Sequence, residues 1–118
     1  MTSITDRVES LKSHIDGGKI LEAIDEFYDD DVEMRENNEP PTTGRAANRE
    51  RESQFMAGVK EWHRTDWHAT AVNEDEGVSF LEYGFEFTST DDQLVTYEQV
   101  AVQRWKDGKI VSERFYHG

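Results

Sequence analysis

The amino-acid sequence predicts an α+β fold with the element order α-α-β-α-β-β-β-β, in which the helices come first and an antiparallel meander follows. Three observations carry this prediction. Apolar residues recur at helical spacing near the N-terminus, and they alternate with polar residues in the second half of the chain. The dipeptide Asp107-Gly108 is a strong signal for a tight hairpin turn between two strand-like runs. With 118 residues and no linker-like segment, we expect one domain over residues 1–118.

Two short helices are expected at the N-terminus. Helical spacing puts one set of apolar residues on a single face, namely Ile4, Val8, Leu11 and Ile15. Ser3 followed by Asp6 forms a capping-box pattern, so the first helix is predicted from about Ile4 to Ile15. Gly17-Gly18 ends it, and a second apolar face predicts a helix from about Lys19 to Tyr28.

A strand, a loop and a third helix follow. Alternation over Val32–Met34 predicts a short strand, and the Asn- and Pro-rich stretch 37–41 must be a loop. Thr42 or Thr43 can cap a third helix, which is predicted from about Gly44 to Trp62.

Four more strands are predicted, at about Thr65–Asn73, Val78–Thr88, Leu94–Trp105 and Ile110–Tyr116. In the second of these, alternation puts four apolar residues on one face, namely Leu81, Tyr83, Phe85 and Phe87. The same register, continued across the turns, places five residues of the last two strands on that side, namely Gln99, Gln103, Trp105, Glu113 and Phe115. A slip of one residue reverses every assignment.

The composition narrows the class of protein. The net charge of −13 argues against binding to nucleic acid and to anionic membranes. With no cysteine, disulfides and thiolate chemistry are excluded. No apolar run is long enough to cross a bilayer and no leader-like segment begins the chain, so we expect a soluble, cytoplasmic protein. The acidic surface fits either general solubility or a high-salt habitat.

Three stretches carry a resemblance to a known family. They are F-Y-D-D-D-V at Phe27–Val32, P-P-T-T-G-R-A-A at Pro40–Ala47 and W-K-D-G-K-I-V-S-E-R-F-Y at Trp105–Tyr116. Together with the element order, they make the chain from about Val8 to His117 resemble the nuclear-transport-factor-2-like superfamily, and within it the SnoaL-like proteins. The resemblance implies a curved sheet wrapped into a cone, three helices closing its wide side, an apolar pocket and a homodimer formed through the outer sheet face.

The family's members include polyketide cyclases, a ketosteroid isomerase, dehydratases, an epoxide hydrolase and proteins without catalysis, so the fold alone does not give the function. In isomerase-like members a carboxylate base ends the first strand, and Glu36 is nearest to that place. Their oxyanion donors have no counterpart here, because the first helix lacks Tyr and the second position falls near Val100 or Ala101. Where SnoaL-type cyclases carry an acid/base Asp, this chain has Phe115.

Glu113 is the leading candidate for a functional acid. Inside an aromatic cone its carboxyl group would lose water, which raises the pKa toward use as a general acid or base. Gln99 is the residue expected to orient it. The alternative is that Glu113 pairs with an arginine or lies at the solvent-exposed opening of the cone.

Glu36 and His63 are the other candidate catalytic residues, and His68 is a candidate at the pocket rim. A histidine near a pocket can move protons, although most are structural residues. The spacing of His63 and His68 matches no metal motif, so neither a metal nor a cofactor is expected.

Tyr83, Trp105 and Phe115 could line an apolar ligand pocket together with Gln99, or could be plain core. Two functions stay open. The first is a small-molecule-binding domain with cofactor-independent acid/base catalysis on a hydrophobic substrate, by isomerisation, cyclisation, dehydration or hydrolysis. The second is a non-catalytic ligand-binding or dimerisation module.

Overall fold

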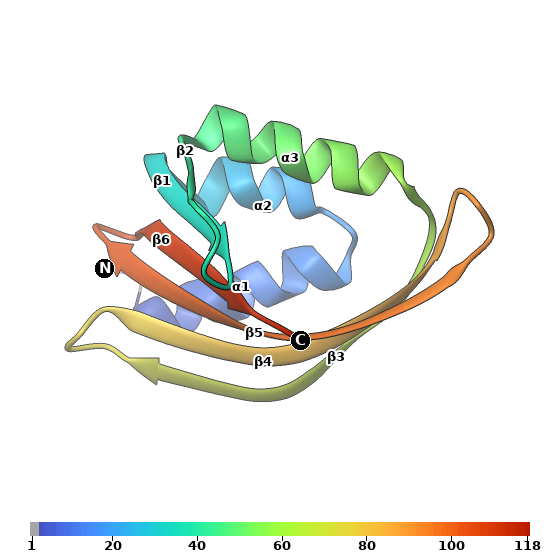
Figure 1. Ribbon diagram of the computed structural model, residues 1–118. Coiled ribbons are helices and arrows are strands. Elements are labelled where there is room, and N and C mark those ends of the chain that lie inside the picture. Colours follow the sequence, from blue (N-terminus) through green and yellow to red (C-terminus); the bar gives the residue numbers. More distant parts are fainter. Residues whose placement is uncertain (1–2) are drawn as a thin grey trace.

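A computed structural model describes residues 3–118, and its element order confirms the predicted α+β class (Figure 1). The helices and strands are α1 (Ile4–Asp16), α2 (Ile20–Phe27), β1 (Tyr28–Glu36), β2 (Thr42–Thr43), α3 (Arg45–Ala57), β3 (Val59–Asn73), β4 (Val78–Ser89), β5 (Leu94–Lys106) and β6 (Lys109–Tyr116).

The strands form one curved, open sheet in the order β2-β1-β6-β5-β4-β3. Every neighbouring pair is antiparallel except β1 and β6, which run parallel. The three helices lie on the concave side of the sheet (Figure 1). The parallel pairing matters for the site, because it sets β1 beside the last strand of the chain.

The start of α1 and the turn between β5 and β6 both form where the sequence signals predict them. In α1, Ser3 Oγ accepts a hydrogen bond from the Asp6 amide at 3.1 Å, as the capping pattern predicts. At the β5–β6 hairpin, Lys106 pairs with Lys109 around Asp107 (φ 52°) and Gly108 (φ 78°). Two positive φ angles are the geometry of a tight turn that matches the twist of the strands.

The third helix is shorter than predicted. It ends at Ala57, and Val59–Trp62 belong to β3, where Trp62 pairs with Phe87 of β4. Pairing with the aromatic strand β4 outweighs the local helical pattern there. Neither Thr42 nor Thr43 caps the helix, because both pair with β1 as β2, and the N-cap is Gly44.

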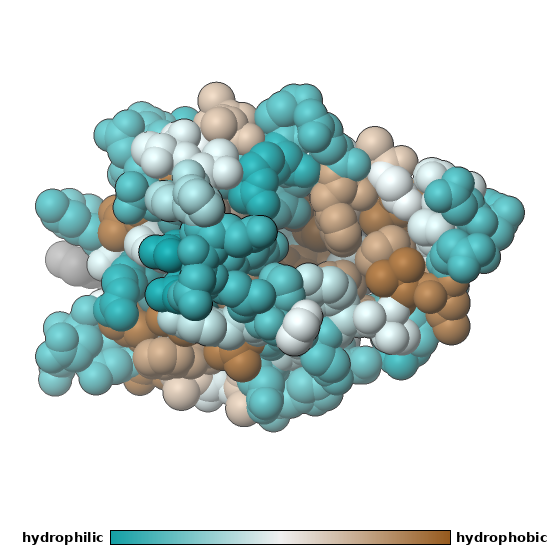
Figure 2. Space-filling model, in the orientation of Figure 1, coloured by the Kyte–Doolittle hydropathy of each residue, from teal (hydrophilic) through white to brown (hydrophobic). Residues whose placement is uncertain are grey.

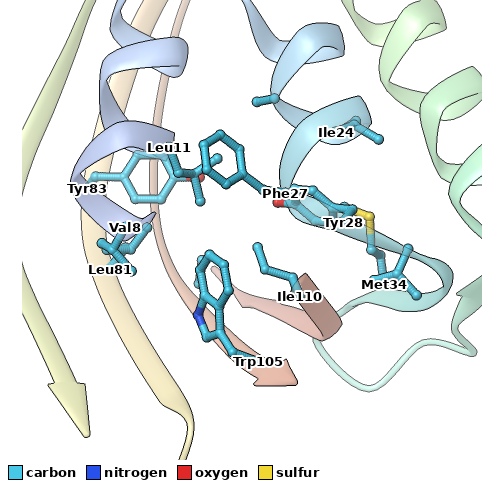
Figure 3. Close-up of a cluster of buried hydrophobic side chains, with 13 residues drawn as sticks. Val8, Leu11, Ile24, Phe27, Tyr28, Met34, Leu81, Tyr83, Trp105 and Ile110 are labelled. Atoms are coloured by element: carbon cyan, nitrogen blue, oxygen red, sulfur yellow. The ribbon is translucent and has the colours of Figure 1, made fainter. Parts of the chain in front are cut away.

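The core lies where α1 and α2 cover β4, β5 and β6. Leu11 and Phe27 of the helices lie over Trp105 and Ile110 of the sheet in Figure 3, and Ile24 and Leu81 belong to the same buried cluster. In contrast, α3 has one buried residue, Asn48, whose amide group donates to the carbonyl oxygens of Thr42 and Gly44 at 2.9 and 2.8 Å. The side chains of α3 therefore leave part of the concave face unfilled.

The surface also differs between the two ends of α3. Hydrophilic side chains cover β1, β2 and the start of α3, whereas hydrophobic side chains show between the end of α3 and the curved strands (Figure 2). No helix among residues 3–118 has both the length and the apolar character required to cross a membrane.

Candidate functional site

A cavity of about 390 Å³ lies between the helices and the concave face of the sheet. Its walls are mainly aliphatic and aromatic, with side chains from all three helices and from β1, β3, β4, β5 and β6. Polar groups also reach the walls, and three of them are carboxyl groups, namely Glu36, Glu52 and Glu113. A mainly apolar space of this volume with convergent polar groups is typical of a small-molecule site.

Glu113 is the deepest of the three carboxyl groups, with 2% of its surface exposed. Strand pairing brings it opposite Met34 of β1 and Gln103 of β5. Its Oε1 accepts a hydrogen bond from the Tyr28 hydroxyl at 2.5 Å, and its Oε2 accepts one from Gln103 Nε2 at 2.6 Å.

Burial raises the pKa of Glu113 to about 7, because a carboxylate loses its hydration in the cavity wall. The hydrogen bonds from Tyr28 and Gln103 lower this pKa, and the nearby charges of Glu52 and Glu36 raise it. A carboxyl group that titrates near neutral pH can both accept and return a proton there.

A chain of buried hydrogen bonds sets the direction of the Gln103 amide. The Trp105 indole can only donate, and it donates to Ser79 Oγ at 2.9 Å. The Ser79 hydroxyl therefore gives its own hydrogen to Gln103 Oε1, at 2.7 Å. Gln103 must then present its NH₂ group to Glu113, so Glu113 Oε2 is held as an acceptor and any proton on this carboxyl belongs on Oε1, beside Tyr28.

Two tyrosines accompany this carboxyl group. Burial raises the pKa of Tyr28 well above its ordinary value, and the charge of Glu113 and its hydrogen bond act in the same direction. Burial also raises the pKa of Tyr83, whose hydroxyl accepts a hydrogen bond from Gln99 Nε2 at 2.7 Å. Both phenols therefore stay protonated at neutral pH and serve as hydrogen-bond donors.

Glu52 and Glu36 lie on other walls of the cavity, on α3 and β1. Desolvation raises the pKa of Glu52, the Arg51 guanidinium lowers it, and the charge of Glu36 raises it further. Glu36 Oε2 lies 3.6 Å from His117 Nε2, and both atoms are buried without a hydrogen-bond partner.

The structure brings five of the predicted residues to the cavity wall, namely Glu113, Glu36, Tyr83, Gln99 and Phe115. Gln99, expected to orient Glu113, donates to Tyr83 instead, and Gln103 takes the expected role. Gln103 lies four residues nearer the hairpin on the same face of β5, directly opposite Glu113.

The other three predicted residues lie elsewhere. Trp105 does not line the cavity; its ring packs in the core and its indole nitrogen holds Ser79. His63 and His68 are exposed on β3, where they contact Thr88 and Glu98. Both were expected at a break between helix and strand, and the early start of β3 removes that break.

No sequence pattern indicates a functional role for Tyr28, Ser79 or Glu52. Tyr28 was assigned to the end of the second helix, yet it begins β1 and pairs with Ile110. Its contact with Glu113 joins residues 85 positions apart, and no local pattern carries that information. Glu52 lies in a polar helix whose charged pattern reads as solvated. Among residues 3–118, no three His, Asp or Glu side chains come close enough together to hold a metal ion.

A curved sheet, three covering helices and a largely apolar cavity between them together define a small-molecule-binding α+β domain. The family model of the SnoaL-like domain matches residues 13–113, and the chain belongs to this family, within the nuclear-transport-factor-2-like superfamily.

Three solved structures share this fold over nearly the whole of this chain. A candidate SnoaL-like polyketide cyclase from Mesorhizobium loti is 26% identical with a TM-score of 0.80, over 99% of this chain and 100% of that one. A candidate polyketide cyclase from Pseudomonas putida is 16% identical with a TM-score of 0.84, over 100% and 93%. A candidate isomerase from Bacillus subtilis is 12% identical with a TM-score of 0.80, over 97% and 85%. No curated protein matches the sequence.

Proposed function

We propose that the protein binds a small, largely apolar molecule in the cavity and transfers protons to and from it without a cofactor, with Glu113 as the acid/base. One observation carries the proposal. Glu113 is a buried carboxyl group on the wall of an apolar cavity, both its oxygens are held by hydrogen bonds, and its pKa is raised to about 7. Perturbed carboxyl groups in clefts are characteristic of sites for acid/base chemistry.

The hydrogen bonds define how each group acts. When Glu113 is ionised, Tyr28 donates to Oε1 and the pair is ready to take a proton. When Glu113 is protonated, Oε1 can donate to the Tyr28 oxygen, and the Tyr28 hydroxyl hydrogen is released to point toward a bound molecule. Gln103 keeps Oε2 in place throughout and is a positioning residue, as are Ser79 and Trp105 behind it.

This arrangement suits reactions in which one proton is removed and another returned, such as isomerisation, cyclisation or dehydration. The similarity to the Mesorhizobium loti candidate cyclase supports the cyclase type among these. An isomerase site has its base at the end of the first strand, and Glu36 occupies that place and lines the same cavity; here the most deeply buried acid is Glu113 on β6.

A carboxyl titration followed by NMR tests the proposal. With ¹³C-labelled glutamate, the signal that is lost in Glu113→Gln should titrate with a midpoint near pH 7, as the raised pKa requires. The signal of Glu82, on the opposite face of the sheet, provides an exposed comparison. A Glu113 midpoint at the ordinary value for glutamate, 4.5, would contradict acid/base use at neutral pH.

A second candidate is a non-catalytic module that pairs through the outer face of the sheet. It is favoured by exposed aromatic rings there, since Phe80 and Tyr116 are each 43% exposed. We propose a homodimer through this face, and sedimentation of wild type and Phe80→Glu checks it. A wild-type protein that stays monomeric at high micromolar concentration would rule out the pairing.

A further inference from the structure

We propose that the molecule taken by this cavity carries a protonated amine on an apolar skeleton. The inference rests on the proposed small-molecule function and specifies its ligand class. It starts from an imbalance of charge. The cavity wall has three carboxyl groups, Glu36, Glu52 and Glu113, and one basic side chain, Arg51.

The carboxyl groups influence one another across the cavity. The charges of Glu36 and Glu52 raise the pKa of Glu113, and the charge of Glu36 raises that of Glu52. Arg51 partly offsets this only at Glu52, its neighbour in sequence, whose pKa it lowers. A positive charge placed between these groups would therefore interact favourably with all three.

Of the three carboxyl groups, Glu113 is the most buried and would gain most from a nearby positive charge. It is buried, and the fixed direction of the Gln103 amide keeps one of its oxygens as an acceptor. That arrangement suits the ionised carboxylate, yet among residues 3–118 Glu113 has no ion-pair partner. Buried charges in proteins are normally paired, so a ligand cation would fill the missing place.

The spacing of the acids favours an organic cation. A metal ion needs several ligands within about 2.0–2.6 Å, and no such group of three exists in the described part of the chain. The cavity of about 390 Å³ is instead the size of roughly a dozen water molecules of liquid. Rings of Trp62, Phe85 and Tyr97 stack along one wall, at 5.0 and 5.2 Å between centroids, and offer contact for an apolar body.

The same groups disfavour an anion. A carboxylate or phosphate would lose its hydration among three acids and would have only Arg51 to pair with. Discrimination of this kind arises as much from repulsion of the wrong ligand as from attraction of the right one.

Amine binding should therefore depend on pH. The titratable and charged groups facing Glu113 are Tyr28 and Glu36 on β1, Arg51 and Glu52 on α3, Tyr83 on β4 and Tyr97 on β5. An ammonium ion binds the ionised form of Glu113, so affinity should rise as pH increases through the Glu113 pKa of about 7. It should fall again when the amine itself loses its proton, near pH 10.

Three matched probes test the inference by isothermal titration calorimetry. They are naphthalen-2-ylmethylamine, naphthalen-2-ylmethanol and naphthalene-2-carboxylate, which share one skeleton and differ in charge. At pH 8 we expect the amine to bind at least about tenfold more tightly than the alcohol. The carboxylate should bind most weakly, and the alcohol should depend little on pH.

Two variants link the preference to the cavity. Glu113→Gln should lower the amine preference over the alcohol severalfold and abolish the rise in affinity near pH 7. If the amide disturbs folding, Glu52→Gln supplies the second test, because Glu52 is half-buried and should reduce the amine preference severalfold. Glu82→Gln removes the same charge from the outer face and should leave the preference unchanged.

The outcomes separate the two claims. If the alcohol or the carboxylate binds as tightly as the amine, the ligand class is wrong and the small-molecule function stands. If none of the three binds at millimolar concentration, both fail. An amine preference that survives in Glu113→Gln and Glu52→Gln alike also overturns the inference.

Discussion

Glu113 and Glu98 lie on neighbouring strands of one hairpin, β6 and β5, but on opposite faces of the sheet. Glu113 is 2% exposed and is held by Tyr28 and Gln103, whereas the Glu98 side chain is 70% exposed and lies 3.0 Å from His68 Nε2. On the inner face, burial raises the pKa of the carboxyl group to about 7. On the outer face, water and salt screen the contact between Glu98 and His68. The surroundings of a glutamate, set by strand alternation, therefore decide its chemistry.

The outer pair lies over a glycine. A Cβ atom at Gly84 would lie 2.1 Å from Glu98 Oε2, so Glu98 reaches His68 across a position that has no side chain. On the inner face, Glu113 belongs to a network of buried polar side chains. On the outer face, water can replace a lost polar contact. On the inner face, each buried hydrogen bond fixes the direction of the next.

The largest expected effect is on the pH dependence of stability. The unfolded chain releases the Glu113 proton at its ordinary pKa of 4.5, whereas the folded protein keeps it up to about 7. As pH rises between these values, this group costs the folded state about 3 kcal/mol, a loss that is complete above pH 7. Urea denaturation from pH 4 to 8 should show this loss in wild type, and Glu113→Gln should lack it.

The introduced amide has its own effect on stability, because its oxygen can accept from Gln103 but its NH₂ group must take the place of Oε1 beside the Tyr28 hydroxyl. The difference in slope with pH is therefore the readout, and the absolute stability at one pH is not. Parallel curves for the two proteins would mean that Glu113 does not titrate near neutral pH.

A smaller effect is expected from Gln103→Leu. This change leaves the Ser79 hydroxyl and Glu113 Oε2 without their partner, at a cost of about 2 kcal/mol. Loss of a donor to the carboxylate should also raise the Glu113 midpoint in an NMR titration. Gln93→Leu, at an exposed turn, is the matched control and should change neither quantity. If the midpoint of the Glu113 titration is the same in Gln103→Leu as in wild type, Gln103 is not a positioning residue.

The smallest effect is expected on the outer face. His68→Ala removes the partner of Glu98 at a site where both side chains are largely exposed, so the free energy of unfolding should change by less than about 0.5 kcal/mol. Glu98→Gln should behave alike in the same urea experiment. A loss as large as that of Gln103→Leu would show that the two faces are not as different as their exposure indicates.

Most of the fold follows from local patterns. The capping pattern at Ser3 placed α1, and Asp107-Gly108 placed the hairpin. The register that put Glu113 inward is confirmed by its burial. Two errors share one cause: α3 was extended through Val59–Trp62, and Tyr28 was given to α2. Both segments pair with distant strands, and pairing outweighs the helical propensity of a short segment.

The sequence by itself determined which side chains share a face, because strand alternation and helical spacing depend only on near neighbours. It therefore predicted the α+β class and an acid facing an aromatic wall. The tertiary structure decided what that acid touches. The parallel pairing of β1 with β6 brings Tyr28 to Glu113 across 85 residues, and the β5–β6 pairing selects Gln103 over Gln99. Hydrogen-bond partners and loss of hydration depend on packing between distant segments, and so the chemistry of Glu113 emerges only in the folded chain.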